Sequence, residues 1–137
     1  MPEEKPGLSQ QFLHAAVAAE AFAEEASDLS DMLVGFEAAL NSIDGKADVS
    51  APTGRGGRVY YARSDGGWRL LYTPKGGSVR ALTSATIEEK IDAITALPTL
   101  VTNLASHHTE NLARVREAKA VLAQLVPTLQ SISKGGA

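Results

Sequence analysis

The sequence contains no cysteine, and this absence removes several classes of protein at once. Disulfide scaffolds, thiol nucleophiles, iron–sulfur clusters and zinc sites with cysteine ligands are all excluded. No run approaches the roughly 20 consecutive apolar residues that a membrane span needs. The first residues are acidic and include proline, unlike a secretory signal. We therefore expect a soluble, cytoplasmic protein that does not enter membranes.

Aromatic residues are also scarce, and alanine takes their place. Phe, Trp and Tyr make up 5% of the 137 residues, whereas 22 residues are alanine. Helices with alanine on their inner faces approach one another closely, so we expect a thin core without many large side chains. A hydrophobic content of 44% with 21% charged residues is the balance of a globular domain rather than of a disordered chain.

The net charge of −3 is unevenly distributed along the chain. Residues 1–48 contain ten acids and two bases, residues 49–86 contain six bases and one acid, and residues 87–137 contain five of each. The overall charge argues against a protein that coats nucleic acid generally, because such proteins are basic. The three regions predict three structural units with different surfaces.

Two long segments have the spacing of coiled-coil helices. Residues 8–44 and 98–132 each carry a seam, a series of mostly apolar or small residues at alternating steps of three and four. The first seam is Phe12, Ala15, Ala19, Phe22, Ala26, Leu29, Leu33, Phe36, Leu40 and Ile43, and the second is Val101, Leu104, His108, Asn111, Val115, Ala118, Leu122, Leu125, Leu129 and Ile132. Because the helices match in length, we expect them to pack antiparallel as a coiled-coil-like hairpin. Pro127 predicts a kink or a break near the end of the second helix.

A ten-residue repeat lies between the helices. Pairs of glycines begin at Gly56, Gly66 and Gly76, and each pair precedes a run that is typical of a strand. Two-residue turns would connect these runs into a three-stranded antiparallel meander over residues 57–84. Such turns keep the alternation of side chains in step from strand to strand. We expect a core face with Val59, Tyr61, Trp68, Leu70, Tyr72, Val79 and Ala81, and an outer face with Arg58, Tyr60, Ala62, Arg69, Leu71, Arg80 and Leu82.

Shorter segments complete the predicted fold. Residues 45–56 form a glycine-rich connector, residues 86–97 form a short helix that ends before Pro98, and residues 133–137 form a frayed tail. An apolar stripe suits the short helix to cover the core face of the sheet, and the adjoining end of the first long helix is the alternative cover. The members of the stripe are Ile87, Ile91, Ile94 and Leu97. The sequence therefore predicts a single α+β domain in which two long antiparallel helices are joined through a three-stranded β-meander and a short helix.

The outer face of the predicted sheet is the strongest candidate binding surface. It carries one guanidinium from each strand around an aromatic ring, with two further cations in adjacent loops. These residues are Arg58, Tyr60, Arg69, Arg80, Arg55 and Lys75. Guanidinium groups bind phosphates or carboxylates through two contacts at once, and a tyrosine ring offers a stacking surface. The face could bind nucleic acid or an acidic protein segment; alternatively, these cations only protect the sheet from aggregation.

Other candidate sites have weaker signals. The glycine-rich run at 53–57 lacks the Gly-Lys-Ser/Thr ending of a phosphate-binding loop and indicates a mobile connector. His107 and His108 point about 100° apart on a helix, which does not suit chelation of one metal. We interpret His108 and Asn111 as polar interruptions of the second seam that fix register or partner choice. No nucleophile with a base is indicated, so we expect no enzyme activity, catalytic residue, cofactor or metal.

Apolar residues outside the two seams indicate further association. They are Leu13, Val17, Met32 and Val34 in the first helix, and Leu100, Leu112, Val121 and Val126 in the second. A two-helix hairpin leaves them uncovered, which favours a dimer in the form of a four-helix bundle, or docking onto an unknown protein partner. The leading hypothesis is a non-enzymatic protein–protein interaction module, an adaptor, chaperone-like or assembly component, that presents its basic meander at one end. The alternative is a small nucleic-acid-binding accessory protein that uses the same sheet face.

Overall fold

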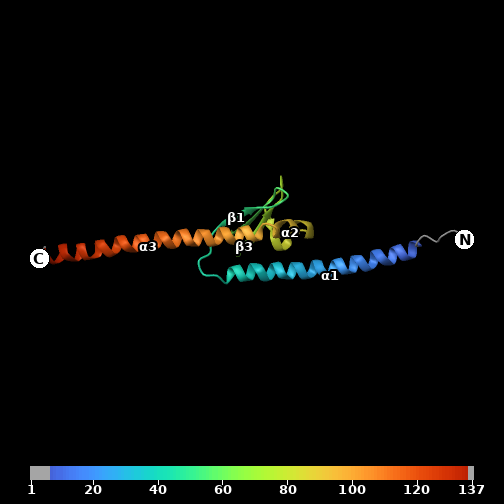
Figure 1. Cartoon of the computed structure of the whole chain (residues 1–137), viewed down its shortest axis with the longest axis horizontal. Coiled ribbons are helices and arrows are strands. Elements are labelled where there is room, and N and C mark those ends of the chain that lie inside the picture. Colours follow the sequence, from blue (N-terminus) through green and yellow to red (C-terminus); the bar gives the residue numbers. More distant parts are fainter. Residues whose placement is uncertain (1–6, 136–137) are drawn as a thin grey trace.

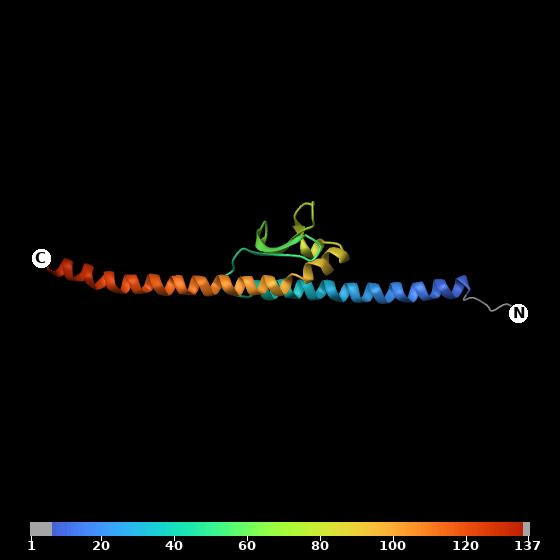
Figure 2. The ribbon, with the colours of Figure 1, turned by 45° about the horizontal axis from the view of Figure 1, so that its top comes forward.

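The structure, a computed structural model, describes residues 7–135. Two long helices, α1 (Leu8–Asn41) and α3 (Leu97–Gly135), extend along one axis, and a small sheet lies against them near the middle (Figure 1, Figure 2). The start of α1 and the end of α3 lie at opposite ends of this axis (Figure 1). The molecule is α+β, as predicted, but the sheet is at the centre of a rod rather than at its tip.

The sheet has four antiparallel strands in the order β1 (Val49–Pro52), β2 (Arg58–Ser64), β3 (Gly67–Thr73) and β4 (Arg80–Ala81). The prediction of three strands missed β1, which lies within the predicted 45–56 connector. The four residues of β1 are too few to show a clear alternation. The strand also ends in proline, which is tolerated there because β1 is an edge strand.

The first hairpin turn is as predicted, and the second is not. Ser64 pairs with Gly67 across a two-residue turn, and Gly67 has a φ of 118°, which favours glycine. In the second connection Tyr72 pairs with Arg80, so an odd number of residues separates them. A two-residue turn would place Pro74 in the ladder, where it has no N–H to donate. The strands instead separate after Tyr72 and enclose a longer loop.

This longer loop reverses the predicted faces of β4. The core face of the first two predicted strands is confirmed, with Val59, Tyr61, Leu70 and Tyr72 buried and Trp68 half-buried. In β4, however, Arg80 shares the face of Tyr72, while Ala81 shares the outer face of Leu71. Val79, expected in the core, is 58% exposed, and Leu82, expected outside, is buried in the 3-10 helix η1 (Leu82–Ser84). The outer face therefore lacks Arg80.

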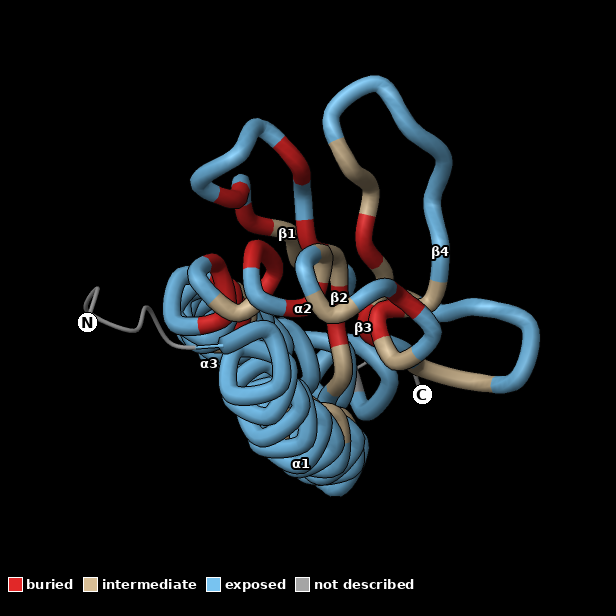
Figure 3. Tube along the Cα trace, turned by 90° about the vertical axis from the view of Figure 1, so that its right-hand side faces the viewer, coloured by how far each residue is buried: buried red, intermediate tan, exposed pale blue. Residues whose placement is uncertain are grey.

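The short helix α2 (Ile87–Ile94) covers the core face together with parts of both long helices. Thr86 and Glu89 form the capping box at its start. The predicted apolar stripe is wrong in part, because Ile91 is 49% exposed while Asp92 and Ala93 are buried. Figure 3 shows that burial is concentrated in the sheet and α2, whereas most of both long helices is exposed.

Side chains from both long helices hold the edges of the sheet. In β3, the Leu70 N–H donates to Glu37 of α1 at 2.9 Å, and the Trp68 carbonyl accepts a hydrogen bond from Asn41 at 3.1 Å. In β1, the Ser50 carbonyl accepts a hydrogen bond from Asn103 of α3 at 2.9 Å. These contacts cover edge backbone groups and fix the directions in which both helices leave the sheet.

The predicted antiparallel hairpin of α1 and α3 is not present. Both helices run in the same direction, α1 toward the sheet and α3 away from it, and they lie alongside each other only near the middle (Figure 1, Figure 2). Their main contacts are with strands, α1 with β3 and α3 with β1. The prediction failed because heptad spacing indicates that a helix needs a partner without indicating which element, or which chain, supplies it.

Helix α3 continues through Pro127 to Gly135. The predicted break is therefore absent, and the axis bends only gently toward the C-terminal end (Figure 2). The missing proline N–H affects a single intrahelical bond on an exposed stretch, where water can replace it. Residues 133–135 of the predicted tail are helical, and 136–137 lie outside the described residues. Within residues 7–135, no helix has the length and apolar character needed to cross a bilayer.

Candidate association surfaces

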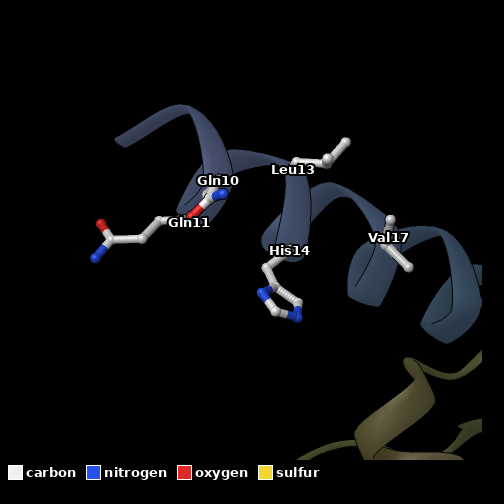
Figure 4. Close-up of a pocket in the computed structure, with 5 residues that line it drawn as sticks. All are labelled: Gln10, Gln11, Leu13, His14 and Val17. Atoms are coloured by element: carbon white, nitrogen blue, oxygen red, sulfur yellow. The ribbon is translucent and has the colours of Figure 1, made fainter. Parts of the chain in front are cut away.

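The first candidate surface is the free part of α1, which we call the α1 arm (residues 8–25). Every residue of this arm is exposed, including the seam residue Phe12 at 77%. The side chains that line a hollow on this arm all come from the one helix (Figure 4). The lining residues are Gln10, Gln11, Leu13, His14 and Val17. The arm therefore presents its apolar seam directly to solvent.

The second candidate surface is the free part of α3, which we call the α3 arm (residues 112–134). Every residue of this arm is exposed as well, and its last seam residue, Ile132, reaches 65%. The other seam residues of the arm are Val115, Ala118, Leu122, Leu125 and Leu129. At 1.5 Å per residue the arms are about 27 Å and 34 Å long, so they are similar in length and point away from the sheet in opposite directions (Figure 1).

An apolar hollow of about 180 Å³ lies at the root of the α1 arm. It is lined by Leu29, Met32, Leu33, Phe36, Ile94 and Leu97. Further along α1, residues of the same seam belong to the hydrophobic core, since Leu33 and Leu40 are buried under the sheet. The exposed seam of the arm is thus continuous with the hydrophobic core.

The two arms carry opposite charges. The α1 arm has three acids and no lysine or arginine, which gives −3, with Glu20, Glu24 and Glu25 all in the half near its root. The α3 arm has four bases and one acid, which gives +3, and most of its bases also lie near the root. The four bases are Arg114, Arg116, Lys119 and Lys134, and the first three lie near the root. The arms are therefore electrostatically complementary to each other.

Between α2 and the sheet, a buried carboxylate joins three segments of the chain. Asp92 of α2 accepts hydrogen bonds from the Thr53 hydroxyl at 2.6 Å, the Tyr72 hydroxyl at 2.7 Å and the Arg55 N–H at 3.1 Å. Thr53 in turn accepts a hydrogen bond from the Gly57 N–H at 2.9 Å. The glycine-rich run predicted to be a mobile connector is instead an ordered hairpin loop that binds an anion of its own chain.

The environment of this carboxylate shifts two pKa values in opposite directions. Burial alone would raise the pKa of Asp92, but hydrogen bonds from Thr53, Tyr72 and the Arg55 N–H outweigh burial and hold it below its ordinary value. Burial and the hydrogen bond to Asp92 raise the pKa of Tyr72 to about 12. The pair is therefore an ionised carboxylate and a neutral phenol over the whole physiological range.

The predicted basic face is only partly assembled. Arg58, Tyr60 and Arg69 do share the outer face of the sheet, as the register of β2 and β3 requires. The Arg58 Nε donates to the Ser50 hydroxyl at 3.0 Å. Arg80 lies apart from them and forms an ion pair with Glu89 at 3.2 Å. Two arginines remain around the tyrosine instead of three.

The two loop cations lie next to each other at one end of the sheet. Arg55 is in the β1–β2 loop, where its N–H binds Asp92. Lys75 is in the β3–β4 loop, and a Cβ added to Gly56 would lie 3.2 Å from its Cδ. Neither cation is on a strand, so both lie at the loop end of the sheet and not on the face around Tyr60.

The two polar interruptions of the second seam differ in their contacts. The His108 ring packs beside Gly45, where an added Cβ would lie 3.4 Å from its Cε1. Asn111 contacts His107 on its own helix, with 2.9 Å between Nδ2 and Nε2. In the part of the chain that the structure describes, no group of three or more potential metal-ligating side chains occurs.

Sequence reasoning missed Asp92, Glu37 and Asn41, the polar residues that hold the sheet to the helices. Asp92 is adjacent to the apolar stripe of its helix, and Glu37 and Asn41 lie beside the seam of α1. Their partners are 20 to 39 residues distant in the sequence. The one available signal was the Thr-Gly-Arg-Gly-Gly run, whose N–H groups suit an anion.

Comparison with known protein families, with curated proteins and with solved structures finds no match.

Proposed function

We propose that this chain is a non-enzymatic protein–protein interaction module, an assembly component or adaptor that self-associates through its two arms. The observation that carries the proposal is that both arms expose an unbroken apolar seam while pointing away from the sheet in opposite directions. The sheet with α2 acts as a junction that holds the arms. The module function thus resides in the helices and not in the sheet face.

The energetics of single helices support this proposal. Most of the stability of a helix in a protein comes from packing of its apolar face rather than from intrinsic helix propensity. Exposed heptad seams of this length are stabilised by pairing with a second helix, which buries the residues at steps of three and four. Both arms therefore gain most of their stability from association.

The polar contacts under the sheet support the role of a junction. Asp92 binds the β1–β2 loop and β3 to α2, and Glu37, Asn41 and Asn103 bind the long helices to the sheet edges. Hydrogen bonds of this kind specify one relative placement of the elements. The junction therefore sets the direction in which each arm meets its partner.

The proposal is tested by sedimentation equilibrium of the full chain and two matched variants. We expect the wild type to sediment above its monomer mass of 14.4 kDa at micromolar concentration. Leu122→Asp places a charge in the seam of the α3 arm and is expected to weaken association on the order of a hundredfold. Ala120→Asp places the same charge two residues away, outside the seam, and should change association little. A wild type that is monomeric throughout, or equal effects of the two variants, would contradict the proposal.

Nucleic-acid binding by the outer sheet face has less support, because Arg80 does not join Arg58 and Arg69. Titration with generic DNA and RNA at increasing salt distinguishes this alternative. Binding with a steep salt dependence that Arg69→Glu abolishes would favour it. We expect neither nucleic acid to bind measurably at physiological salt.

A further inference from the structure

We propose that the partner of each arm is the opposite arm of a second copy of this chain, so that the α1 arm of one copy pairs antiparallel with the α3 arm of the other in a closed dimer. This inference rests on the proposed function and specifies its partner. It follows from the directions, the charges and the seam residues of the two arms.

The directions of the arms suit a two-fold dimer. In one chain, α1 runs inward to the sheet and α3 runs outward on the other side (Figure 1). A two-fold axis perpendicular to the rod places a second copy with its α3 arm beside the first copy's α1 arm. These two helices then run in opposite directions, and symmetry forms the same pair at the other end. The antiparallel pairing predicted within one chain is thereby formed between two chains.

The charges distinguish this arrangement from pairing of like arms. Two α1 arms would bring −3 against −3, and two α3 arms would bring +3 against +3, whereas the mixed pair brings −3 against +3. Pairing of like arms therefore brings charges of one sign together in both arm pairs. The complementary pair is therefore the one that the sequence favours.

The position of the charges also distinguishes a closed dimer from an open chain of molecules. In the closed dimer, root lies beside root, so the acids at 20–25 lie near the level of the bases at 114–119. In a head-to-tail chain, the root of the α1 arm lies beside the tip of the α3 arm, where Lys134 is the single base. The clustering of both charge types near the sheet favours the closed form.

The seam residues give the register of the pair. Positions whose numbers sum to 144 face each other when the two arms are aligned over their full lengths. The resulting layers along the α1 arm are Phe12 with Ile132, Ala15 with Leu129, Ala19 with Leu125 and Phe22 with Leu122, and the half-buried root of the arm adds Ala26 with Ala118 and Leu29 with Val115. Alanines at 15 and 19 then lie opposite leucines, and the exposed arms contribute apolar layers only. His108 and Asn111 remain outside these layers.

Engineered cysteines test the pairing cleanly, because the chain has none of its own. In the double variant Ala19→Cys/Leu125→Cys, the thiol at position 19 of one copy faces the thiol at position 125 of the second copy. Mild oxidation should therefore convert most of the protein to a covalent dimer and produce no larger species. Each single variant, Ala19→Cys or Leu125→Cys, should remain unlinked, since the two equivalent positions lie at opposite ends of the dimer.

Two further double variants serve as controls. The first replaces only small side chains, so that it retains the fold, and the second tests the register. Ala26→Cys/Ala118→Cys changes only small side chains and should crosslink as the first pair does. Ala19→Cys/Ala118→Cys is displaced by one heptad, about 10 Å along the pair, and should crosslink poorly. Circular dichroism of the reduced variants confirms that each retains its helix content.

Each other outcome overturns the proposed pairing. Efficient crosslinking of Ala19→Cys alone means that like arms pair, an intramolecular disulfide in the double variant means a hairpin within one chain, and a ladder of larger species means an open chain. In all three cases sedimentation still reports whether the wild type self-associates. A dimer with the wrong crosslinks contradicts this inference alone, whereas a monomer contradicts the proposed function as well.

Discussion

Asp92 is the residue on which the junction depends most. It accepts three hydrogen bonds in a buried position, and its donors come from the β1–β2 loop and from β3. Loss of the charge leaves buried donors without an equivalent acceptor. This single side chain therefore couples the sheet to α2.

We expect Asp92→Asn to lower the free energy of unfolding by about 2 to 3 kcal/mol, measured by urea denaturation. The exposed Glu88 of the same helix provides the control, and Glu88→Gln should cost less than about 1 kcal/mol. Because the folded pKa of Asp92 lies below its ordinary value of 3.8, its contribution is complete above that pH and is lost as the pH falls below it. The variant should lack this part of the acid destabilisation; an unchanged acid profile would contradict the assignment.

Tyr72 produces the opposite pH dependence at the alkaline end. Its pKa is raised from 10.0 to about 12 in the folded state, so its contribution is complete below pH 10 and is lost as the pH rises toward 12. Tyr72→Phe removes both the hydrogen bond to Asp92 and the titration. We expect the variant to be less stable than the wild type by about 1 to 2 kcal/mol near neutral pH, with the difference shrinking above pH 10. A difference that stays constant up to pH 12 would argue against this role.

At the scale of secondary structure, features that depend on neighbouring residues were predicted well, and features that depend on residues distant in the sequence were predicted poorly. The glycine pairs located the first hairpin, and the capping box located the start of α2, because both depend on residues within a few positions. The prediction of the second hairpin turn was wrong at Pro74, because proline has no N–H to donate to the ladder and the loop is longer as a result. The faces of β4 depend on that loop length, so an error there moved Arg80 out of the candidate site.

Two glycines differ in whether their position has space for a side chain, and alanine substitution tests this difference. Gly35 lies inside α1, where an added Cβ would meet nothing within 4 Å. We expect Gly35→Ala to stabilise the protein by about 0.5 to 1 kcal/mol, because alanine is the better helix former. Gly57 in the β1–β2 hairpin is the contrast, since its Cβ would lie 2.8 Å from the Thr73 carbonyl oxygen. Thermal denaturation should show opposite shifts for the two alanine variants, and equal shifts would refute the distinction.

At the scale of the whole molecule, one seam serves two different partners. Leu33 and Leu40 of α1 pack under the sheet of their own chain, while Phe12 and Phe22 are exposed on the arm. The spacing along the seam is the same in both parts, so the sequence alone does not reveal where one partner ends and the other begins. That point is set by the sheet, whose position results from the fold of residues 42–96.

The charges of the arms lead to a prediction that concerns the complete assembly. Glu24→Lys/Glu25→Lys makes the α1 arm basic, and Arg114→Glu/Arg116→Glu makes the α3 arm acidic. Each double variant alone brings like charges together in both arm pairs of a dimer, and we expect its association to weaken on the order of tenfold at low salt.

Mixing the two double variants should restore association. In the mixed dimer the reversed α1 arm of one chain meets the reversed α3 arm of the other, and the two unreversed arms meet at the opposite end, so both pairs are complementary again. Sedimentation equilibrium of the mixture at about 0.02 M salt measures this recovery, and salt at about 1 M should abolish the difference by screening. If instead the mixture associates no better than either variant alone, the α1 arm of one copy does not pair with the α3 arm of the other. Pairing of like arms would also be complementary in the mixture, and crosslinking of Ala19→Cys alone distinguishes it.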